Sequence, residues 1–193
     1  MGGTTSKLDE SLQKYEDLTY LNFKQIKNCH NRFTDIKKRE NVNSGSLVDL
    51  TKPVCTYDDL FESVPELGHN PFRDRICDVF SSEQGRKLNF LEFLDICSVF
   101  NENASQEAKI KRAFQIFDFD NDGFIGKGDI SKVIKTIVPD DSNTNLNITD
   151  AVSDQIFKEF GGPEENKLLT KFQVQEMLEK SPEFADNFTF ALQ

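Results

Sequence analysis

This chain of 193 residues is short of several residue types, and each shortage narrows what it can do. It has no tryptophan, two methionines and two histidines, so histidine bases for an enzyme are scarce. No apolar run approaches the roughly 18 residues of a membrane-spanning helix. Acidic residues outnumber basic ones, giving a formal charge of −10, and no basic stripe offsets that charge. Nucleic acid is therefore excluded as the main partner.

Cysteines are few and are spread along the chain without a CxxC pair or a secretory leader pattern. The four are Cys29, Cys55, Cys77 and Cys97. This spacing predicts free, mostly buried thiols in a reducing compartment. We therefore expect a cytoplasmic protein.

The N-terminus fits the pattern in which Met1 is removed and Gly2 is myristoylated, with Ser6 at the required position. An unmodified, flexible start is the alternative. One myristoyl chain gives only marginal, reversible membrane binding. We therefore expect reversible association with the inner face of the plasma membrane.

The chain is rich in phenylalanine, with 18 residues, and in apolar residues at helical spacing. They recur at i, i+3, i+4 and i+7 on both sides of short polar loops, as on amphipathic helices. On the first of these faces, His30 is interpreted as a packed core histidine. The predicted buried faces are Ile26, Cys29, His30 and Phe33; Phe72, Ile76, Val79 and Phe80; Phe90, Phe93, Leu94 and Cys97; Ile110, Ala113, Phe114 and Phe117; Ile130, Val133, Ile134 and Ile137; Val152, Ile156 and Phe160; Val174, Met177 and Leu178.

Helix starts are marked by capping residues. Thr56 with Asp59 and Thr170 with Gln173 fit the capping box, in which the first side chain caps the helix and the second reaches back. Asn89 is predicted as a simple cap. Helical pairs with caps at matching places indicate an internally repeated helix–loop–helix unit.

Residues 118–129 match the calcium-binding loop of an EF-hand. Carboxylates at positions 1, 3 and 5 surround a hard cation with oxygen ligands, and position 7 offers its backbone carbonyl. Gly123 at position 6 permits the sharp turn, and Ile125 at position 8 suits a short β-bridge to a partner loop. We predict one metal site with these ligands: Asp118, Asp120, Asp122, Phe124 and Asp129.

Position 12 of this loop departs from the usual pattern, because Asp129 replaces the glutamate that chelates with two oxygens. The shorter side chain is expected to bind through one oxygen or through water. Gly126 at position 9 leaves a second corner to water. A lower coordination number favours Mg²⁺ and weakens Ca²⁺, so the predicted cofactor is Ca²⁺ or Mg²⁺ at a single site.

Two further loops fail on the same criteria. Residues 81–92 have Ser81 at position 1 and Arg86 at position 6. Residues 162–173 place Lys167 at position 6, where a cation loop tolerates no positive charge. Both keep an apolar residue at position 8. They are predicted to be structural hands that pair with their neighbours and bind no metal.

These patterns predict an all-α fold of four EF-hand-like helix–loop–helix units in two lobes, with short β-bridges between paired loops. Residues 1–17 are predicted as an N-terminal extension with the myristoylation signal. Residues 18–104 are predicted as an N-terminal lobe with degenerate hands 1 and 2. Residues 105–193 are predicted as a C-terminal lobe with a metal-binding hand 3, a degenerate hand 4 and a C-terminal tail.

The tail carries an apolar residue at every fourth position, Phe184, Phe188 and Leu192, which predicts a helical stripe. Two interpretations stay open. The stripe either packs permanently in the core or occupies a partner groove as a displaceable internal substitute.

The chain contains several distinctive short segments: Pro65-Glu66-Leu67, Asn70-Pro71-Phe72-Arg73, Phe90-Leu91-Glu92-Phe93 and Ser181-Pro182-Glu183-Phe184. These segments resemble the calcium and integrin-binding family of EF-hand proteins, and the resemblance covers nearly the whole chain from about residue 18. The aspartate at position 12 of the third hand and the Gly2 signal add to it. Calcineurin B-like regulatory subunits share the Gly2 signal and the Pro-Glu-Leu…Asn-Pro stretch that begins at Pro65, so they are the nearest alternative.

The resemblance implies a non-catalytic adaptor that binds amphipathic helices in a hydrophobic groove. Partners of such proteins include integrin α-subunit cytoplasmic tails, kinases and channel proteins. Members usually bind metal at the third and fourth hands, whereas only the third fits here. The alternatives are a regulatory subunit of a phosphatase or transporter, and a simple Ca²⁺/Mg²⁺ buffer. A haloacid dehalogenase-type phosphatase, with Asp118 as nucleophile, would require Asp118 at the end of a strand.

Overall fold

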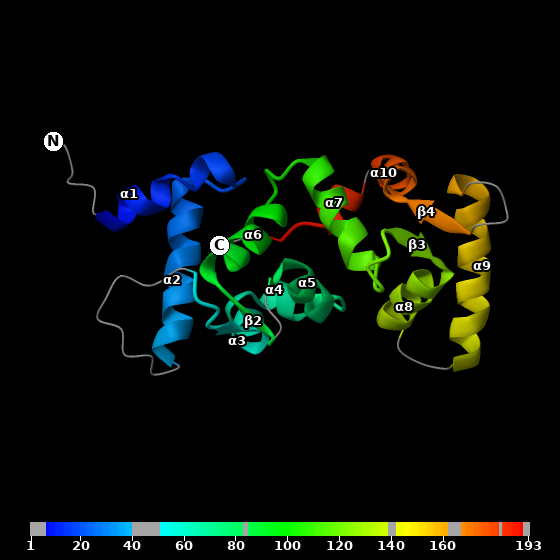
Figure 1. Cartoon of the computed structure of the whole chain (residues 1–193), viewed down its shortest axis with the longest axis horizontal. Coiled ribbons are helices and arrows are strands. Elements are labelled where there is room, and N and C mark those ends of the chain that lie inside the picture. Colours follow the sequence, from blue (N-terminus) through cyan, green and yellow to red (C-terminus); the bar gives the residue numbers. More distant parts are fainter. Residues whose placement is uncertain are drawn as a thin grey trace. The chain divides into compact units, whose positions relative to one another are not determined.

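The computed structural model describes residues 7–39, 51–82, 85–138, 142–161, 167–181 and 183–190, except for the side chains of residues 37–39 and 142–147. Contacts divide the chain into two compact units, Met1–Ser105 with Thr189–Gln193, and Gln106–Phe188 (Figure 1). The described residues form helices joined by two small antiparallel sheets. The predicted all-α class is confirmed. None of the described helices is both long and apolar enough to cross a membrane.

The first unit contains two helix–loop–helix units whose loops pair through strands β1 and β2. The strands are antiparallel, with Cys55 opposite Leu88. Helix α1 lies within the predicted N-terminal extension and buries Leu12. The elements in chain order are α1 (Lys7–Gln13), η1 (Glu16–Leu18), α2 (Phe23–Arg39), β1 (Cys55–Thr56), α3 (Tyr57–Ser63), α4 (Pro65–Gly68), α5 (Arg73–Phe80), β2 (Lys87–Leu88) and α6 (Phe90–Val99).

The core of the first unit is aromatic. Phe33 on α2 packs edge-on against Phe90, with ring centroids 5.5 Å apart, and lies 5.8 Å from Phe93. His30 is buried and meets Phe90 edge-on at 5.6 Å, so its interpretation as a core residue is confirmed. All four cysteines are free and buried, as predicted. This aromatic layer joins the two hands of the unit.

The second unit repeats this plan with hands 3 and 4. Strand β3 pairs antiparallel with β4, with Ile125 opposite Leu169, so the predicted bridge at position 8 is confirmed. In Figure 1 the two strands lie between α8 and α10. The elements are α7 (Gln106–Phe117), β3 (Phe124–Gly126), α8 (Lys127–Ile137), α9 (Ser142–Phe160), β4 (Leu168–Thr170), α10 (Lys171–Glu179) and α11 (Phe184–Asn187). The buried core comprises Phe114, Ile125, Ile130, Ile134, Phe157, Leu169 and Val174.

Helix α9 fits its predicted apolar stripe only in part, because Ile156 and Phe160 are half-buried against the core and Val152 is not. Val152 is 37% exposed, although it opens the predicted stripe. The buried residues are Thr149, Ser153 and Phe157, which follow one another at i+4. Two of these three are small and polar, so a hydrophobic pattern does not detect them. The fully buried line thus lies one residue along from the predicted stripe, and Ile156 and Phe160 lie at its edge.

The predicted caps form in the structure. Capping boxes are present at Thr56 and Thr170. Asn89 differs from its prediction as a simple cap, because Glu92 Oε2 accepts the Asn89 N–H at 2.8 Å and completes a third capping box. Each box satisfies backbone donors that a helix start leaves without partners.

The C-terminal segment is helical only over α11. The rings of Phe184 and Phe188 stack with centroids 5.4 Å apart. The helix ends at Asn187 and Phe188 is its C-cap, so the predicted helical stripe does not continue past Phe188 among the described residues. Leu192, the third residue of the predicted stripe, lies outside the described residues. In the first unit, Phe190 donates its N–H to Phe100 O at 3.0 Å and stacks on the Phe100 ring at 4.9 Å.

Candidate metal centre

The loop between α7 and α8 is turned by two residues in the left-handed region. Asn121 has φ of 58° and Gly123 has φ of 86°. Glycine takes this conformation without a Cβ clash, and asparagine tolerates it better than most residues. The loop then enters β3, and α8 begins at Lys127. Asp129 is therefore held in the first turn of α8, facing back into the loop.

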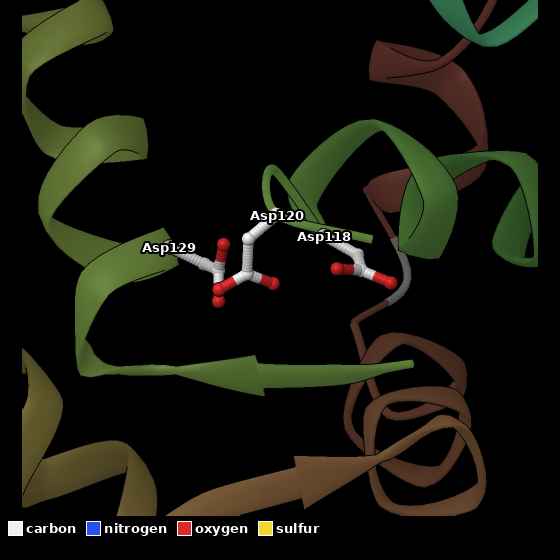
Figure 2. A group of neighbouring side chains, drawn as sticks. All are labelled: Asp118, Asp120 and Asp129. Atoms are coloured by element: carbon white, nitrogen blue, oxygen red, sulfur yellow. The ribbon is translucent and has the colours of Figure 1, made fainter. Parts of the chain in front are cut away.

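Three carboxylates of this loop meet. One oxygen from each of Asp118, Asp120 and Asp129 lies within 4.8 Å of the others. Figure 2 shows Asp118 and Asp120 reaching from the segment after α7, and Asp129 from the start of α8. Asp118 and Asp129 are buried, whereas Asp120 is exposed. A set of hard oxygen donors of this kind fits a divalent cation such as Ca²⁺ or Mg²⁺.

Backbone N–H groups orient the carboxylate at position 1. Asp118 Oδ1 accepts the N–H of Asp122 at 3.1 Å, and Asp118 Oδ2 accepts the N–H of Gly123 at 3.0 Å. Asp122 Oδ1 accepts the N–H of Phe124 at 2.8 Å and does not belong to the group of three. The structure thus brings together three of the five predicted ligands. Asp122 and the backbone carbonyl of Phe124 stay predictions as ligands.

The carboxylate at position 12 is held from both sides. Asp129 Oδ1 accepts the N–H of Phe119 at 2.9 Å, and Oδ2 accepts the N–H of Gly126 at 3.0 Å. Hydrogen bonds from backbone donors to a carboxylate are charge-assisted and short, and each oxygen retains a lone pair for another ligand. Sequence reasoning missed this double hold. A signal for the bond from Gly126 was available, because position 12 of the loop is also the third residue of α8, from which an acid can reach back to the N–H of the N-cap residue.

The loop of hand 2 has the same hydrogen bonds to its position 12 carboxylate as hand 3, but its described residues lack the metal-ligating side chains of hand 3. Glu92 at position 12 accepts the N–H of Ser82 through Oε1 at 2.7 Å and the N–H of Asn89 through Oε2 at 2.8 Å. These donors occupy positions 2 and 9, as Phe119 and Gly126 do in hand 3. No cluster of metal-ligating side chains forms in the described part of this loop, which omits residues 83–84.

Position 6 of hand 2 carries a cationic side chain. Arg86 has φ of 56°, so a non-glycine residue takes the left-handed turn. Its guanidinium pairs with Asp74 at 2.5 Å and lies 4.7 Å over the ring of Tyr57. Hydrogen bonding to Asp74 raises the pKa of Arg86, so the side chain stays charged. A fixed positive charge at this position opposes a metal ion in the same loop.

Hand 4 is described only in part, because residues 162–166 lie outside the described residues. Lys167 pairs with Asp154 of α9 at 2.9 Å. The hydrogen bond and charge of Lys167 lower the pKa of Asp154 below its usual range. Gly2, the predicted lipidation site, also lies outside the described residues.

The phosphatase alternative fails on the local structure. Asp118 directly follows helix α7, whereas that reading requires a nucleophilic aspartate at the end of a strand. The carboxylate group, the turned loop and the paired strands instead define an EF-hand metal-binding protein. A family model described as an EF-hand domain pair matches residues 107–180, which span hands 3 and 4.

Similar proteins narrow the assignment from EF-hand proteins in general to one family. The chain is 31% identical over 183 residues to calcium and integrin-binding family member 2 of Drosophila melanogaster, and 30% identical over 182 residues to the Danio rerio protein of that name. Each alignment covers 93% of both chains. Calcium and integrin-binding family member 3 of Homo sapiens is 29% identical over 184 residues, which are 93% of this chain and 92% of that protein. The chain belongs to the calcium and integrin-binding family.

Family membership and the EF-hand pair together define a calcium-binding regulatory protein. Of the two families that the sequence left open, this is the one that the relatives show. The integrin binding that the relatives' names mention is stated of those proteins.

Proposed function

We propose that this chain is a Ca²⁺- and Mg²⁺-binding regulatory adaptor that binds amphipathic helical segments of partner proteins. The observation that carries the proposal is the group of three carboxylates, Asp118, Asp120 and Asp129, inside an EF-hand loop. An adaptor of this kind acts by binding and has no catalytic residues.

We assign five ligands to one metal site in hand 3: Asp118, Asp120, Asp122, the Phe124 carbonyl and Asp129. Both Asp129 oxygens accept a backbone N–H, so the side chain is fixed in place, and aspartate is one methylene shorter than the glutamate that chelates with two oxygens at this position. This supports binding through one oxygen, with water at Gly126. Six-fold coordination of this kind favours Mg²⁺ at rest and admits Ca²⁺ during signals.

A single site follows from the chemistry of the other loops. Arg86 in hand 2 and Lys167 in hand 4 each bring a positive charge to position 6 and form ion pairs with aspartates. Hands 2 and 4 are therefore structural. Hand 4 supports hand 3 through the pairing of β4 with β3, hand 2 pairs with hand 1 through β2 and β1, and neither adds a metal.

The partner is an amphipathic helix that lies in a hydrophobic groove, a recurring mode of EF-hand recognition. The names of the relatives include integrin binding, which supports an integrin as a partner. Within this proposal the bound segment is the cytoplasmic tail of an integrin α-subunit, or a segment of a channel or kinase. In the second unit, six apolar side chains are only partly covered and pack at the margin of the core. They are Phe117, Ile148, Ile156, Phe160, Met177 and Leu178.

The C-terminal segment is proposed to occupy the partner site as a displaceable substitute. Within the second unit, Phe184 and Phe188 stack on each other and are half-buried. A four-residue helix such as α11 is marginal by itself, so its place depends on these contacts. A partner helix that offers more apolar surface is expected to replace it.

Myristoylation of Gly2 is proposed to attach the adaptor reversibly to the inner face of the plasma membrane from a cytoplasmic pool. A single acyl chain suffices only for reversible binding, so a membrane-protein partner would add the second contact. Fractionation of cells that express the wild type or Gly2→Ala tests this. The Gly2→Ala protein should move to the soluble fraction, and an unchanged distribution would reject lipid attachment.

The adaptor function is tested by retention of the protein on an immobilised integrin α cytoplasmic-tail peptide. The wild-type protein should be retained on the peptide with Ca²⁺ and released by EDTA. The Asp118→Ala protein should not be retained, either with Ca²⁺ or with EDTA. Glu92→Gln is the matched control, because it changes position 12 of a hand proposed to bind no metal. Equal retention in all conditions would make the protein a constitutive scaffold. If no variant is retained and metal leaves the exposure of apolar surface unchanged, a simple buffer is indicated.

A further inference from the structure

One lysine of the second unit is in an unusual place. Lys109, in the first half of α7, is 2% exposed and is the single lysine among the buried residues of the described part of the chain. Its ammonium donates a hydrogen bond to the carbonyl oxygen of Ala185 in α11 at 3.1 Å. Both elements belong to the second unit. The C-terminal segment is thus held by a buried charge as well as by apolar contacts.

The surroundings of this ammonium make an acceptor necessary. Burial lowers the pKa of Lys109, and the negative charge of Asp186 opposes that shift. A buried ammonium without an acceptor is costly, because it has left water and gained nothing in return. Ala185 lies in the last turn of α11, where a helix has carbonyls beyond the reach of its own donors and where cations are favourable. The short helix therefore offers Lys109 both a carbonyl and a nearby carboxylate.

Replacement of this segment by a partner helix changes that balance. A helix that continues past Lys109 uses its interior carbonyls for its own N–H groups, so it has no free backbone acceptor there. Within such a helix, only a side chain can take the place of the Ala185 carbonyl. A carboxylate is the best acceptor, since charge-assisted hydrogen bonds are about twice as strong as neutral ones.

We propose that Lys109 determines partner specificity: the helix that displaces the C-terminal segment carries an aspartate or glutamate that binds the Lys109 ammonium in place of the Ala185 carbonyl. The inference rests on the proposed function, because it names the chemistry of the partner at the same site. The net charge of −10 disfavours acidic peptides in general. Tighter binding of a peptide with one acidic residue at one position can therefore be distinguished from the general repulsion of acidic peptides.

The test uses the full-length, Ca²⁺-loaded protein and a synthetic amphipathic helix about 18 residues long. The parent peptide has a Leu/Phe stripe and glutamine elsewhere, and each glutamine is replaced in turn by glutamate. Fluorescence anisotropy should show one position, or two a helical turn apart, at which glutamate tightens binding by about tenfold. Glutamate at the remaining positions should leave binding unchanged or weaken it. In Lys109→Met, which keeps the length of the side chain and removes its charge, the preference should vanish.

Lys111→Met is the matched control, because Lys111 lies on the same helix and is exposed. The Lys111→Met protein should retain the preference for glutamate. If this variant also lost the preference, the effect would come from charge in general, and the proposal would be overturned. A second measurement uses the wild type alone. Carbodiimide coupling of the bound glutamate peptide, read by mass spectrometry, should join that glutamate to Lys109. Coupling to a different lysine would overturn the assignment.

This experiment separates the groove-binding function from the role of Lys109. If no peptide binds, the groove-binding function fails and this inference falls with it. If peptides bind and glutamate is never favoured, or is favoured equally by Lys109→Met, the proposed function stands and the role of Lys109 is rejected.

Discussion

The loops of hands 3 and 2 have the same hydrogen-bonded frame and different chemistry. In both, the carboxylate at position 12 accepts N–H groups from positions 2 and 9, through Asp129 in one loop and Glu92 in the other. In both, position 6 takes a left-handed turn. Hand 3 then directs carboxylates inward, whereas hand 2 places Arg86 against Asp74 and Tyr57.

The difference separates what shapes an EF-hand loop from what binds the ion. Capping of the outgoing helix, strand pairing and the turn at position 6 are common to both loops, so none of them by itself makes a metal site. Metal chemistry depends on the acids at positions 1, 3 and 5. In hand 3 the frame also orients Asp129, because both of its carboxylate oxygens accept backbone N–H groups of the loop.

The largest expected effect comes from position 1 of hand 3. Asp118→Ala removes a buried carboxylate of the group of three and the acceptor for two backbone N–H groups. Calorimetry should show a loss of Ca²⁺ affinity of about a hundredfold or more, because a direct ligand is lost. Glu92→Gln, the equivalent test in hand 2, should leave Ca²⁺ affinity unchanged. A fall of similar size in Glu92→Gln would mean that hand 2 binds metal, and the contrast between the loops would be wrong.

A smaller effect is expected at position 12. Asp129→Glu adds one methylene and restores the reach for chelation with two oxygens, which suits Ca²⁺ and not the strict octahedron of Mg²⁺. The ratio of Ca²⁺ to Mg²⁺ affinity should rise by about tenfold, equivalent to about 1.4 kcal/mol. Calorimetric titration with each ion, and with Ca²⁺ in the presence of Mg²⁺, measures the ratio. An unchanged ratio would show that Asp129 does not set metal preference.

Sequence reasoning reached the fold and the loop because both depend on local signals. Apolar spacing located α7 and α8, and the apolar residue at position 8 predicted the pairing of Ile125 with Leu169. It erred where small polar residues face the core, as Ser153 does in α9. Lys109 was beyond its reach, because its contact with Ala185 joins residues far apart in sequence. The identity of all five ligands, the domain limits and lipidation at Gly2 stay predictions.

Position 6 of hand 2 gives a stability test of about 1 kcal/mol. Arg86→Ala and Arg86→Gly both remove the guanidinium, with its exposed ion pair to Asp74, so they differ only in backbone preference. With φ of 56° at this position, the alanine variant retains strain that glycine relieves. The glycine variant should be more stable by about 1 kcal/mol in urea unfolding followed by circular dichroism. Equal stabilities would mean that residue 86 does not hold the left-handed turn in solution.

The smallest effect concerns acid, and it extends the comparison from the loops to the two units. Both histidines of the chain, His30 and His69, lie in the first unit. Burial lowers the pKa of His30 below 6.5, although a hydrogen bond with Asn31 opposes the shift. Above pH 6.5 the ring is neutral in the folded and the unfolded chain, so it does not affect stability. Below pH 6.5 the unfolded chain binds the proton first, and the free energy of unfolding falls by at most about 1.4 kcal/mol per pH unit until the folded pKa is passed.

Hydrogen exchange in EDTA, read by mass spectrometry between pH 7 and pH 5.5 after correction for the intrinsic rate, resolves the two units. Peptides from α2 should lose protection as the pH falls, because His30 packs there against Phe90, whereas peptides from α7 should keep theirs. His30→Phe should remove the difference, and His69→Gln should preserve it because His69 is at the surface. Equal losses in α2 and α7 would assign the acid effect to carboxylates of both units. The division between an aromatic unit that senses acid and a metal-binding unit would then not hold.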